Sequence, residues 1–419
     1  MTIKSAIESI RVWGIKGAIS YARRWPTLHR LHISDKHTGN PPQRGITLVG
    51  PFSSHGGIAQ TMRSFAEMLM RVGIPFQSFD MNDHPSIPKS DYERFVTPRK
   101  EFDLGKYSHV IELLSTHAPK SPDRHHTLLM FWEFETGATF AFPESKSGIP
   151  ILTMSDFNAS YFRRTVPSET PVFKIRYPLM LNEKNSTPPD IVRKKYGIPH
   201  DAFMVFFNFD YGSSYFRKNP EAVISAFAAA FHPQDNAILV LKTSNAEKNP
   251  VTSKRLHDLS NKLLLDRKRL ILIEKPLPQA DMSGLFNACD TYISLHRGEG
   301  FGIGMAEAMS FGKPVIATNY SANTEFCRSE TSILLPFKMV PPKPHEIDLN
   351  AYSHVERWAD PDVAAASAAL RRCYDEPTLR TSIGKASASF IREYFSPENF
   401  KHDIEKFLDG TPYSLEQTS

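Results

Sequence analysis

Residues 289–326 read CDTYISLHRGEGFGIGMAEAMSFGKPVIATNYSANTEF, and they carry the strongest indication of the fold class. The apolar run Thr291–Leu295 is typical of a buried strand, and it leads into a loop with glycines at 298, 300 and 302. A helix is expected to begin near Gly304. A strand, a glycine loop and a helix in this order are the unit of a doubly wound α/β domain, which binds ligands beyond the carboxyl ends of its strands.

The glycine loop is suited to holding an anion beside a sugar. The amides of Gly302, Ile303 and Gly304 are expected to point out of the helix N-terminus, where the peptide dipoles favour negative charge. Glu299 lies in the loop, and Glu307 lies one turn into the helix. Carboxylates fit here if they accept hydrogen bonds from sugar hydroxyls while amides and cations hold phosphates. The alternative is a glycine-rich turn with two surface glutamates, which the length and density of the pattern disfavour.

Outward from this stretch, strands and helices alternate along most of the chain. In residues 191–390 we predict strands at 204–209, 237–242, 270–273, 291–295, 315–318 and 333–335. In residues 45–190 we predict strands at 45–50, 74–79, 109–114, 128–132 and 151–154. A segment rich in Pro and Lys near residue 190 separates the two series. The predicted fold class is therefore α/β, with two doubly wound parallel-sheet domains.

A second segment carries positive charge at the end of a strand. Residues 206–212, FFNFDYG, lead to Arg217 and Lys218 at a helix start, which would suit a diphosphate. The alternative is an exposed basic pair. Lys242 follows the apolar run 238–241 and is a further basic candidate, with an ordinary strand-end lysine as its alternative.

The motif Glu299-x7-Glu307, within RGEGFGIGMAEAMSFGKPVIAT (297–318), resembles the signature of a known family. This family comprises the retaining, nucleotide-sugar-dependent glycosyltransferases of group 1 (GT4-like), which have the GT-B fold. The resemblance spans roughly residues 45–400 and implies two Rossmann-like domains facing a cleft, with the donor held mainly by the second. It implies that Glu307 binds the ribose hydroxyls and that Glu299 lies near the donor sugar. The backbone of Phe301, Gly302 and Ile303 would contact the donor phosphates or sugar.

The resemblance extends to further residues. Lys218 matches the family's lysine, whereas Asp210-Tyr211 stands near the place of its arginine, for which Arg217 is the substitute. Gly56 and Gly57 resemble the glycine loop of the first domain, with a plain βα turn as the alternative.

Two first-domain features resemble cleft elements of related enzymes. His117 lies where they carry a histidine near the sugar, although 16 histidines make a chance match a competing reading. Phe131-Trp132-Glu133 resembles an acceptor-side element, and a core tryptophan at a strand end is its alternative.

Composition and missing motifs exclude several classes of protein. Hydrophobic residues make up 41% and charged residues 23%, as in ordinary globular proteins. Three cysteines are too few for a disulfide framework, and no apolar run is long enough to span a membrane, so we expect a cytoplasmic protein. A formal net charge of +5 is too small to indicate nucleic acid binding. Asp360-Pro-Asp362 has the spacing of a metal motif, but a helix N-cap explains it better. The nicotinamide dinucleotide fingerprint is absent, which disfavours a dehydrogenase.

The two ends of the chain give further expectations. Residues 1–44 are basic and aromatic, which suits the inner, anionic surface of a membrane, with a helix packed on the protein as the alternative. Residues 391–419 contain a short amphipathic helix able to return to the first domain.

The sequence thus predicts a metal-independent, retaining hexosyltransferase. It would move a sugar from a UDP- or GDP-linked donor to the hydroxyl of a glycan or lipid-linked oligosaccharide, as in the synthesis of cell-surface polysaccharide or lipopolysaccharide. The donor is a substrate, and no cofactor is expected. The alternative is a non-catalytic nucleotide-sugar-binding subunit of a glycan-assembly complex, which donor hydrolysis would distinguish.

Overall fold

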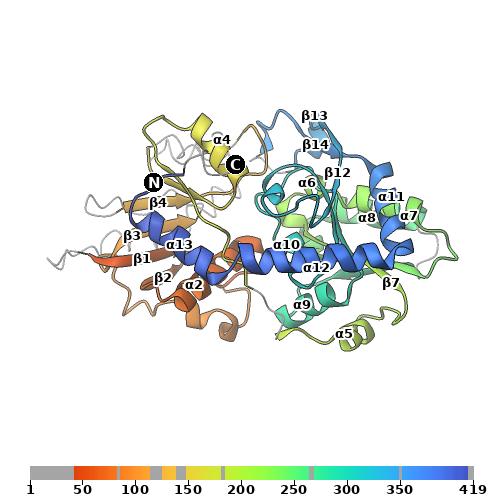
Figure 1. Ribbon diagram of the computed structural model, residues 1–419, viewed down its shortest axis with the longest axis horizontal. Coiled ribbons are helices and arrows are strands. Elements are labelled where there is room, and N and C mark those ends of the chain that lie inside the picture. The colour runs from red at the N-terminus through yellow and green to blue at the C-terminus, as the bar shows by residue number, and fades with distance from the viewer. Residues whose placement is uncertain are drawn as a thin grey trace. The chain divides into compact units, whose positions relative to one another are not determined.

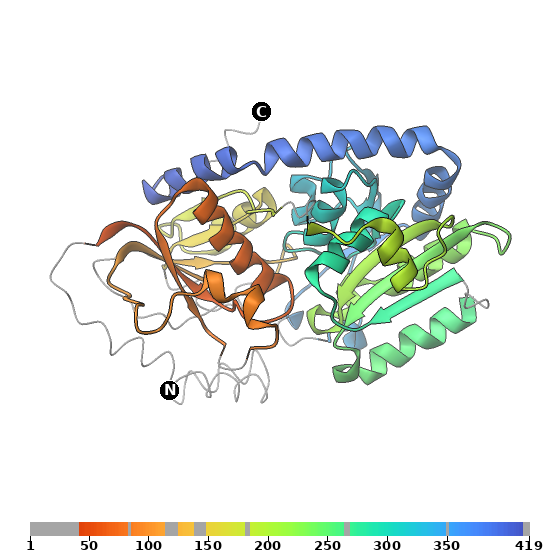
Figure 2. The same cartoon turned by 90° about the horizontal axis from the view of Figure 1, so that it is seen from below.

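The computed structural model describes residues 42–82, 85–113, 125–137, 148–180, 185–263, 269–348 and 352–413. The chain divides into two compact units. Unit 1 comprises residues 1–180, 349–354 and 395–419, and unit 2 comprises residues 181–348 and 355–394. Each unit is described by itself below (Figures 1 and 2).

Unit 1 is built on a six-stranded sheet in the order β2-β1-β3-β4-β5-β6, with all neighbouring strands parallel. The chain moves from β1 to β2 and then reverses past β1 to β3, which makes the β1/β3 junction the switch point of the sheet. Apolar residues on the strands and on one face of α2 form the core. The elements are β1 (Gln43–Gly50), α2 (Gly57–Val72), β2 (Phe76–Asp80), β3 (Tyr107–Leu113), β4 (His125–Leu129), β5 (Ile151–Thr153), α4 (Asp156–Thr165) and β6 (Val172–Lys174).

Unit 2 repeats this architecture in the order β12-β11-β10-β7-β8-β9, again with parallel neighbours. Its strands are β7 (Phe203–Asp210), β8 (Ala237–Ser244), β9 (Leu270–Glu274), β10 (Thr291–Ser294), β11 (Val315–Thr318) and β12 (Ile333–Leu335). Its helices are α5 (Pro189–Lys195), α6 (Tyr215–Lys218), α7 (Pro220–Ala230), α8 (Pro250–Leu263), α9 (Gln279–Ala288), α10 (Ile303–Ser310), α11 (Val363–Asp375) and α12 (Pro377–Tyr394). The chain runs outward from β7 to β9 and then returns past β7 to β10. Since crossover connections are right-handed, this reversal places α7 and α8 on one face and α9 and α10 on the other.

A small hairpin is inserted into unit 2 between β12 and α11. Its strands, β13 (Phe337–Val340) and β14 (Trp358–Pro361), pair antiparallel. Within the segment that joins them, residues 349–354 belong to unit 1. There the ring of Tyr352 packs against Trp132 and Phe134, with ring centroids 5.7 Å and 5.1 Å away.

The last helix, α13 (Pro397–Leu408), completes unit 1. It packs on α2 and β6, and the two ribbon views show it beside α2 (Figures 1 and 2). Phe400 meets Phe65 edge to face with ring centroids 5.6 Å apart, and Phe407 meets Phe173 at 5.2 Å. The amphipathic pattern of residues 397–408 thus serves to cover the sheet of the first unit.

We expect low pH to weaken the packing of α13 on unit 1. Phe407 of this helix also packs on His109 of β3, with ring centroids 5.3 Å apart. Burial, with the positive charges of His125 and Arg44, lowers the pKa of His109 to about 4, against the opposing effect of Asp409. The folded state therefore prefers neutral His109, and the stability present above pH 6.5 is lost as the pH falls toward 4.

The melting temperature of wild type should therefore fall by several degrees more than that of His109→Gln over this pH interval. Thermal denaturation followed by circular dichroism between pH 6.5 and 4 measures the difference. His402→Gln, which changes an exposed histidine on α13, is the control and should keep the wild-type pH dependence. Equal slopes for wild type and His109→Gln would contradict the prediction.

The predicted α/β class with two doubly wound parallel sheets is confirmed, but the divisions of the chain differ from those expected. The first boundary lies at 180/181 rather than 190/191, and the last lies at 394/395 rather than 390/391. The reason is that α5 packs on α9 and α12 packs on α10, which assigns both helices to unit 2. The short strand β6 and the β13–β14 hairpin were not predicted. Residues 1–41 of the basic N-terminal segment lie outside the described residues. Among the described helices, none is long and apolar enough to cross a membrane.

Candidate functional site

The candidate site lies at the switch point of the sheet in unit 2. There β7 and β10 are parallel neighbours whose onward connections leave in opposite directions. The loop after β7 carries α6 with Arg217 and Lys218, and the loop after β10 carries the glycines and Glu299. This topology brings together two segments about 80 residues apart in sequence at the edge where open α/β sheets bind ligands.

Two glycines shape the turn that opens α10. Gly302 caps the helix with φ of 100°, and a Cβ there would lie 2.5 Å from the Cε of Met305. A Cβ at Gly304 would lie 2.5 Å from the hydroxyl oxygen of Tyr292, so that side chain sits directly against the first turn. Glycine is therefore required by backbone conformation at 302 and by close packing at 304. The result is an α10 N-terminus with its first amides in the geometry that favours an anion.

Glu299 is the electrostatic centre of the site. Its residue is 7% exposed, and its Oε1 lies 2.5 Å from the Nζ of Lys218 while its Oε2 lies 3.5 Å from Nη1 of Arg217. Burial opposes ionisation, but the charges of Lys218 and Arg217 outweigh it and lower the pKa of the Glu299 carboxyl to about 2. The carboxyl is therefore ionised at neutral pH and accepts hydrogen bonds. Its backbone amide donates to the hydroxyl of Ser321 over 2.8 Å.

Arg217 joins α6 to the glycine loop. It is 3% exposed, and its Nη1 donates to the carbonyl of Gly298 over 2.8 Å, while Nη2 donates to the carbonyl of Ser213 over 2.7 Å. Asn219 follows α6 with φ of 54°, and its side chain donates to the carbonyl of Leu295 over 2.9 Å. Thus both ends of the Arg217–Lys218 pair are fixed to the β10 loop.

A buried histidine lies next to this cluster, and it was not identified from the sequence as a site residue. His296 is fully buried, with its Nδ1 3.1 Å from the Ser294 hydroxyl and its Nε2 3.1 Å from Oδ1 of Asn323. Burial lowers its pKa, and the nearby Glu299 opposes this shift. The only sequence signal was its place directly after the predicted strand 291–295, which 16 histidines make weak.

The remaining predicted residues of this loop lie around the same turn. Glu307 is half-buried on α10, one turn beyond Gly302, and Ile303 is half-buried at the first position of the helix. Phe301 is buried, with its ring 5.1 Å from that of Phe326, so the Phe301 side chain anchors the loop in the core.

Asp210, which stands near the place of the family's arginine, and Lys242, the further basic candidate, lie on the neighbouring strands β7 and β8. Asp210 ends β7 and closes the following turn, accepting from the Gly212 amide at 2.6 Å, the Ser244 hydroxyl at 2.9 Å and the Asn245 amide at 2.8 Å. Lys242 lies opposite Asn208 and two residues before the end of β8 rather than at the strand end. Burial lowers its pKa, while Asp210 acts in the opposite direction. Among the described residues, the cations that form ion pairs with Glu299 are Lys218 and Arg217.

The first-domain candidates are described with unit 1. Gly56 caps α2 with φ of 100°, and both Gly56 and Gly57 are exposed. Arg63 secures this loop by donating to the carbonyls of Phe52 and Ser54. Trp132 is a core residue, 1% exposed, whose indole donates to the carbonyl of Thr136. His117 lies outside the described residues.

The comparisons with known proteins agree with this architecture. Residues 190–337 match the family described as Glycosyl transferases group 1. Sucrose-phosphate synthase from Thermosynechococcus elongatus is 16% identical with a TM-score of 0.63, covering 88% of this chain and 99% of its own. HepE of Anabaena, solved with UDP and glucose, is 14% identical with a TM-score of 0.59, covering 88% and 100%.

A third solved structure is WaaG, described as a glycosyltransferase involved in lipopolysaccharide biosynthesis. It is 16% identical with a TM-score of 0.55, covering 87% of this chain and 99% of its own. At these identities the likeness shows the fold, and it confirms the predicted GT-B class. No curated protein sequence matches the chain significantly.

Proposed function

We propose that this protein, whose residues 190–337 belong to the group 1 glycosyltransferases, transfers a sugar from a UDP- or GDP-linked donor. The transfer would retain the configuration of the sugar. One observation carries the proposal. The buried carboxylate Glu299 is held by Lys218 and Arg217 immediately before the N-terminus of α10, and Glu307 lies one turn into that helix. This arrangement offers cations and amides to phosphate and carboxylates to sugar hydroxyls.

In the proposed reaction the site acts mainly on the leaving group. The bond between the anomeric carbon and the diphosphate oxygen breaks, and negative charge develops on the nucleoside diphosphate. Lys218, Arg217 and the first amides of α10 would stabilise that charge. The acceptor hydroxyl forms the new bond from the same face of the sugar, and its proton passes to a diphosphate oxygen. Glu299 and Glu307 would orient the sugar and the ribose. The proposal includes no metal and no cofactor.

Three further parts of the proposal depend on sequence patterns and family resemblance. They are an acceptor that is a glycan or lipid-linked oligosaccharide, a cytoplasmic location and attachment of residues 1–44 to an anionic membrane surface. The involvement of WaaG in lipopolysaccharide biosynthesis supports, by analogy of fold, a role in cell-surface glycan synthesis.

Replacing Glu307 by alanine tests the nucleotide site directly. A screen of nucleoside diphosphates by thermal shift should find that UDP or GDP raises the melting temperature of wild type, since a ligand stabilises by RT ln(1 + [L]/Kd). Glu307→Ala should weaken binding of that nucleotide by about 10- to 100-fold, because a charged hydrogen bond contributes roughly 1.5–3 kcal/mol.

Glu330→Ala, which changes an exposed glutamate in the same unit, is the control and should bind as wild type does. Unchanged affinity in Glu307→Ala would remove the ribose assignment. If neither UDP nor GDP stabilises wild type, the proposed function fails.

A further inference from the structure

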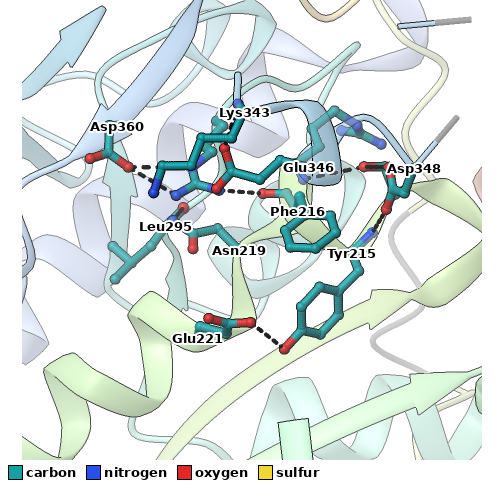
Figure 3. A network of polar contacts seen from close by, with 12 residues as sticks. Tyr215, Phe216, Asn219, Glu221, Leu295, Lys343, Glu346, Asp348 and Asp360 are labelled. Carbon is teal, nitrogen blue, oxygen red and sulfur yellow. Dashed lines mark hydrogen bonds and ion pairs between the residues drawn. The ribbon is translucent and has the colours of Figure 1, made fainter. Parts of the chain in front are cut away.

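The segment inserted between β12 and α11, of which the structure describes residues 336–348 and 352–362, holds α6 at two points. It lies almost wholly beyond the family match, which ends at residue 337. Figure 3 shows acidic side chains of this segment, with Asp348 beside Tyr215 of α6, Glu346 near Phe216, and Asp360 farther away at the left. α6 is a four-residue helix, and a single turn of helix is not stable without outside contacts.

The first point is the N-terminus of α6. Oδ1 of Asp348 accepts from the Ser214 hydroxyl over 2.5 Å, and its Oδ2 accepts from the Tyr215 amide over 2.8 Å. Ser214 has φ of 73°, a conformation that non-glycine residues adopt only where their surroundings fix it. The same Ser214 oxygen accepts from the Arg217 amide over 3.3 Å. Asp348 is thus linked through Ser214 to the residue beside Glu299.

The second point is the middle of α6. Nη1 of Arg297 donates to the carbonyl of Phe216 over 3.2 Å, and the Arg297 amide donates to the carbonyl of Arg217 over 2.8 Å. The inserted segment fixes this guanidinium on three sides. Nη2 of Arg297 lies 3.1 Å from Oδ1 of Asp360, and Nη1 lies 3.5 Å from Oε1 of Glu346. The Cζ of Arg297 lies over the Trp358 ring, 4.8 Å from its centroid.

We propose that the inserted segment is a positioning element of the transfer site, in which Asp348, directly, and Glu346 and Asp360, through Arg297, fix α6 so that Lys218 and Arg217 meet Glu299. The inference rests on the proposed function for its effect on turnover. The expected effect on the conformation of α6 is independent of the proposed function.

The test compares two aspartates of unit 2 that both cap helices. Asp348 caps α6, whereas Asp362 caps α11, accepting from the Ala365 amide over 3.0 Å. Hydrogen–deuterium exchange should show amides 214–219 exchanging at least tenfold faster in Asp348→Ala and unchanged in Asp362→Ala. Asp348→Asn keeps one carbonyl acceptor and should lie between wild type and Asp348→Ala, which keeps the test open if the alanine variant folds poorly. Wild-type exchange of residues 214–219 in both Asp348 variants would overturn the inference.

Turnover supplies the second readout. Release of nucleoside diphosphate should be at least fivefold slower in Asp348→Ala and within twofold of wild type in Asp362→Ala. In a Lys218→Ala background, Asp348→Ala should add less than a twofold loss, because both changes remove the same interaction. A full additional loss would overturn the inference. Exchange needs no substrate, so it decides the inference even if wild type turns over neither UDP- nor GDP-sugars, the result that would overturn the proposed function.

Discussion

Lys218→Ala is expected to slow sugar transfer about a hundredfold, which corresponds to about 2.7 kcal/mol of lost transition-state stabilisation. The ammonium group of Lys218 lies 2.5 Å from Oε1 of Glu299. Lys218 belongs to α6, and hydrogen bonds fix both ends of this helical turn. A cation held in advance stabilises developing charge on the leaving diphosphate without reorganisation during the reaction. Arg217, which also contacts Glu299, would remain and account for the residual rate.

The measurement is kcat for nucleoside diphosphate release, with the donor that wild type turns over. Lys254→Ala removes an exposed lysine of the same unit and should leave kcat unchanged. Lys218→Arg keeps the charge but changes its shape, and an intermediate rate is expected. Lys218→Ala leaves buried Glu299 with one cation, which is expected to lower the stability of the variant. The melting temperature of Lys218→Ala is therefore measured as well, and kcat is compared at a temperature below it. A wild-type kcat in Lys218→Ala would sink the assignment of this residue.

Ending the chain after Tyr394 is expected to unfold unit 1. This deletion removes α13, whose buried side chains are Phe400, Ile404, Phe407 and Leu408. Burying each such side chain contributes roughly 1.5–3 kcal/mol, so their loss amounts to about 6–12 kcal/mol. Whole domains are stable by only about 5–15 kcal/mol. The deletion should therefore abolish cooperative melting of unit 1 and open its strands to limited proteolysis.

Ending the chain after Tyr413 is the matched control. It keeps α13 and the hydrogen bonds of Tyr413 to Arg163 and Asp156, and it should melt as the full chain does. Phe407→Ala provides a graded version, with an expected loss of roughly 3–5 kcal/mol. If the chain ending at Tyr394 resists protease as the full chain does, the packing of α13 contributes little and the prediction is wrong.

Local patterns in the sequence predicted the parts of the site that depend on local conformation. The glycine spacing in residues 298–304 located the turn because positive φ and close packing leave few other residues possible. The apolar runs located most strands of the two sheets because buried parallel strands are apolar on both faces. Asp362 was correctly interpreted as a helix cap, since it lies directly before an apolar helical run.

Contacts between distant segments could not be predicted in this way. Asp348 and Ser214 are 134 residues apart, and Asp348 lies in a Pro-rich stretch with no periodic pattern. The family pattern suggested a cation near Asp210, whereas the fold uses that carboxylate to close the turn after β7. β6 has three residues, too few for a strand pattern to be recognised. The boundary near residue 190 was misplaced because Pro and Lys are also common at the start and end of a surface helix, here α5.

The position of α13 has a consequence for how the protein is made. Unit 1 begins at the start of the chain, yet its covering helix leaves the ribosome about 230 residues after β6. At 5–20 residues per second, this interval lasts roughly 10–50 s. During that time Phe65 and Phe173 lack their aromatic partners, and all of unit 2 is synthesised. We therefore expect the nascent first unit to expose this apolar surface until α13 has been translated.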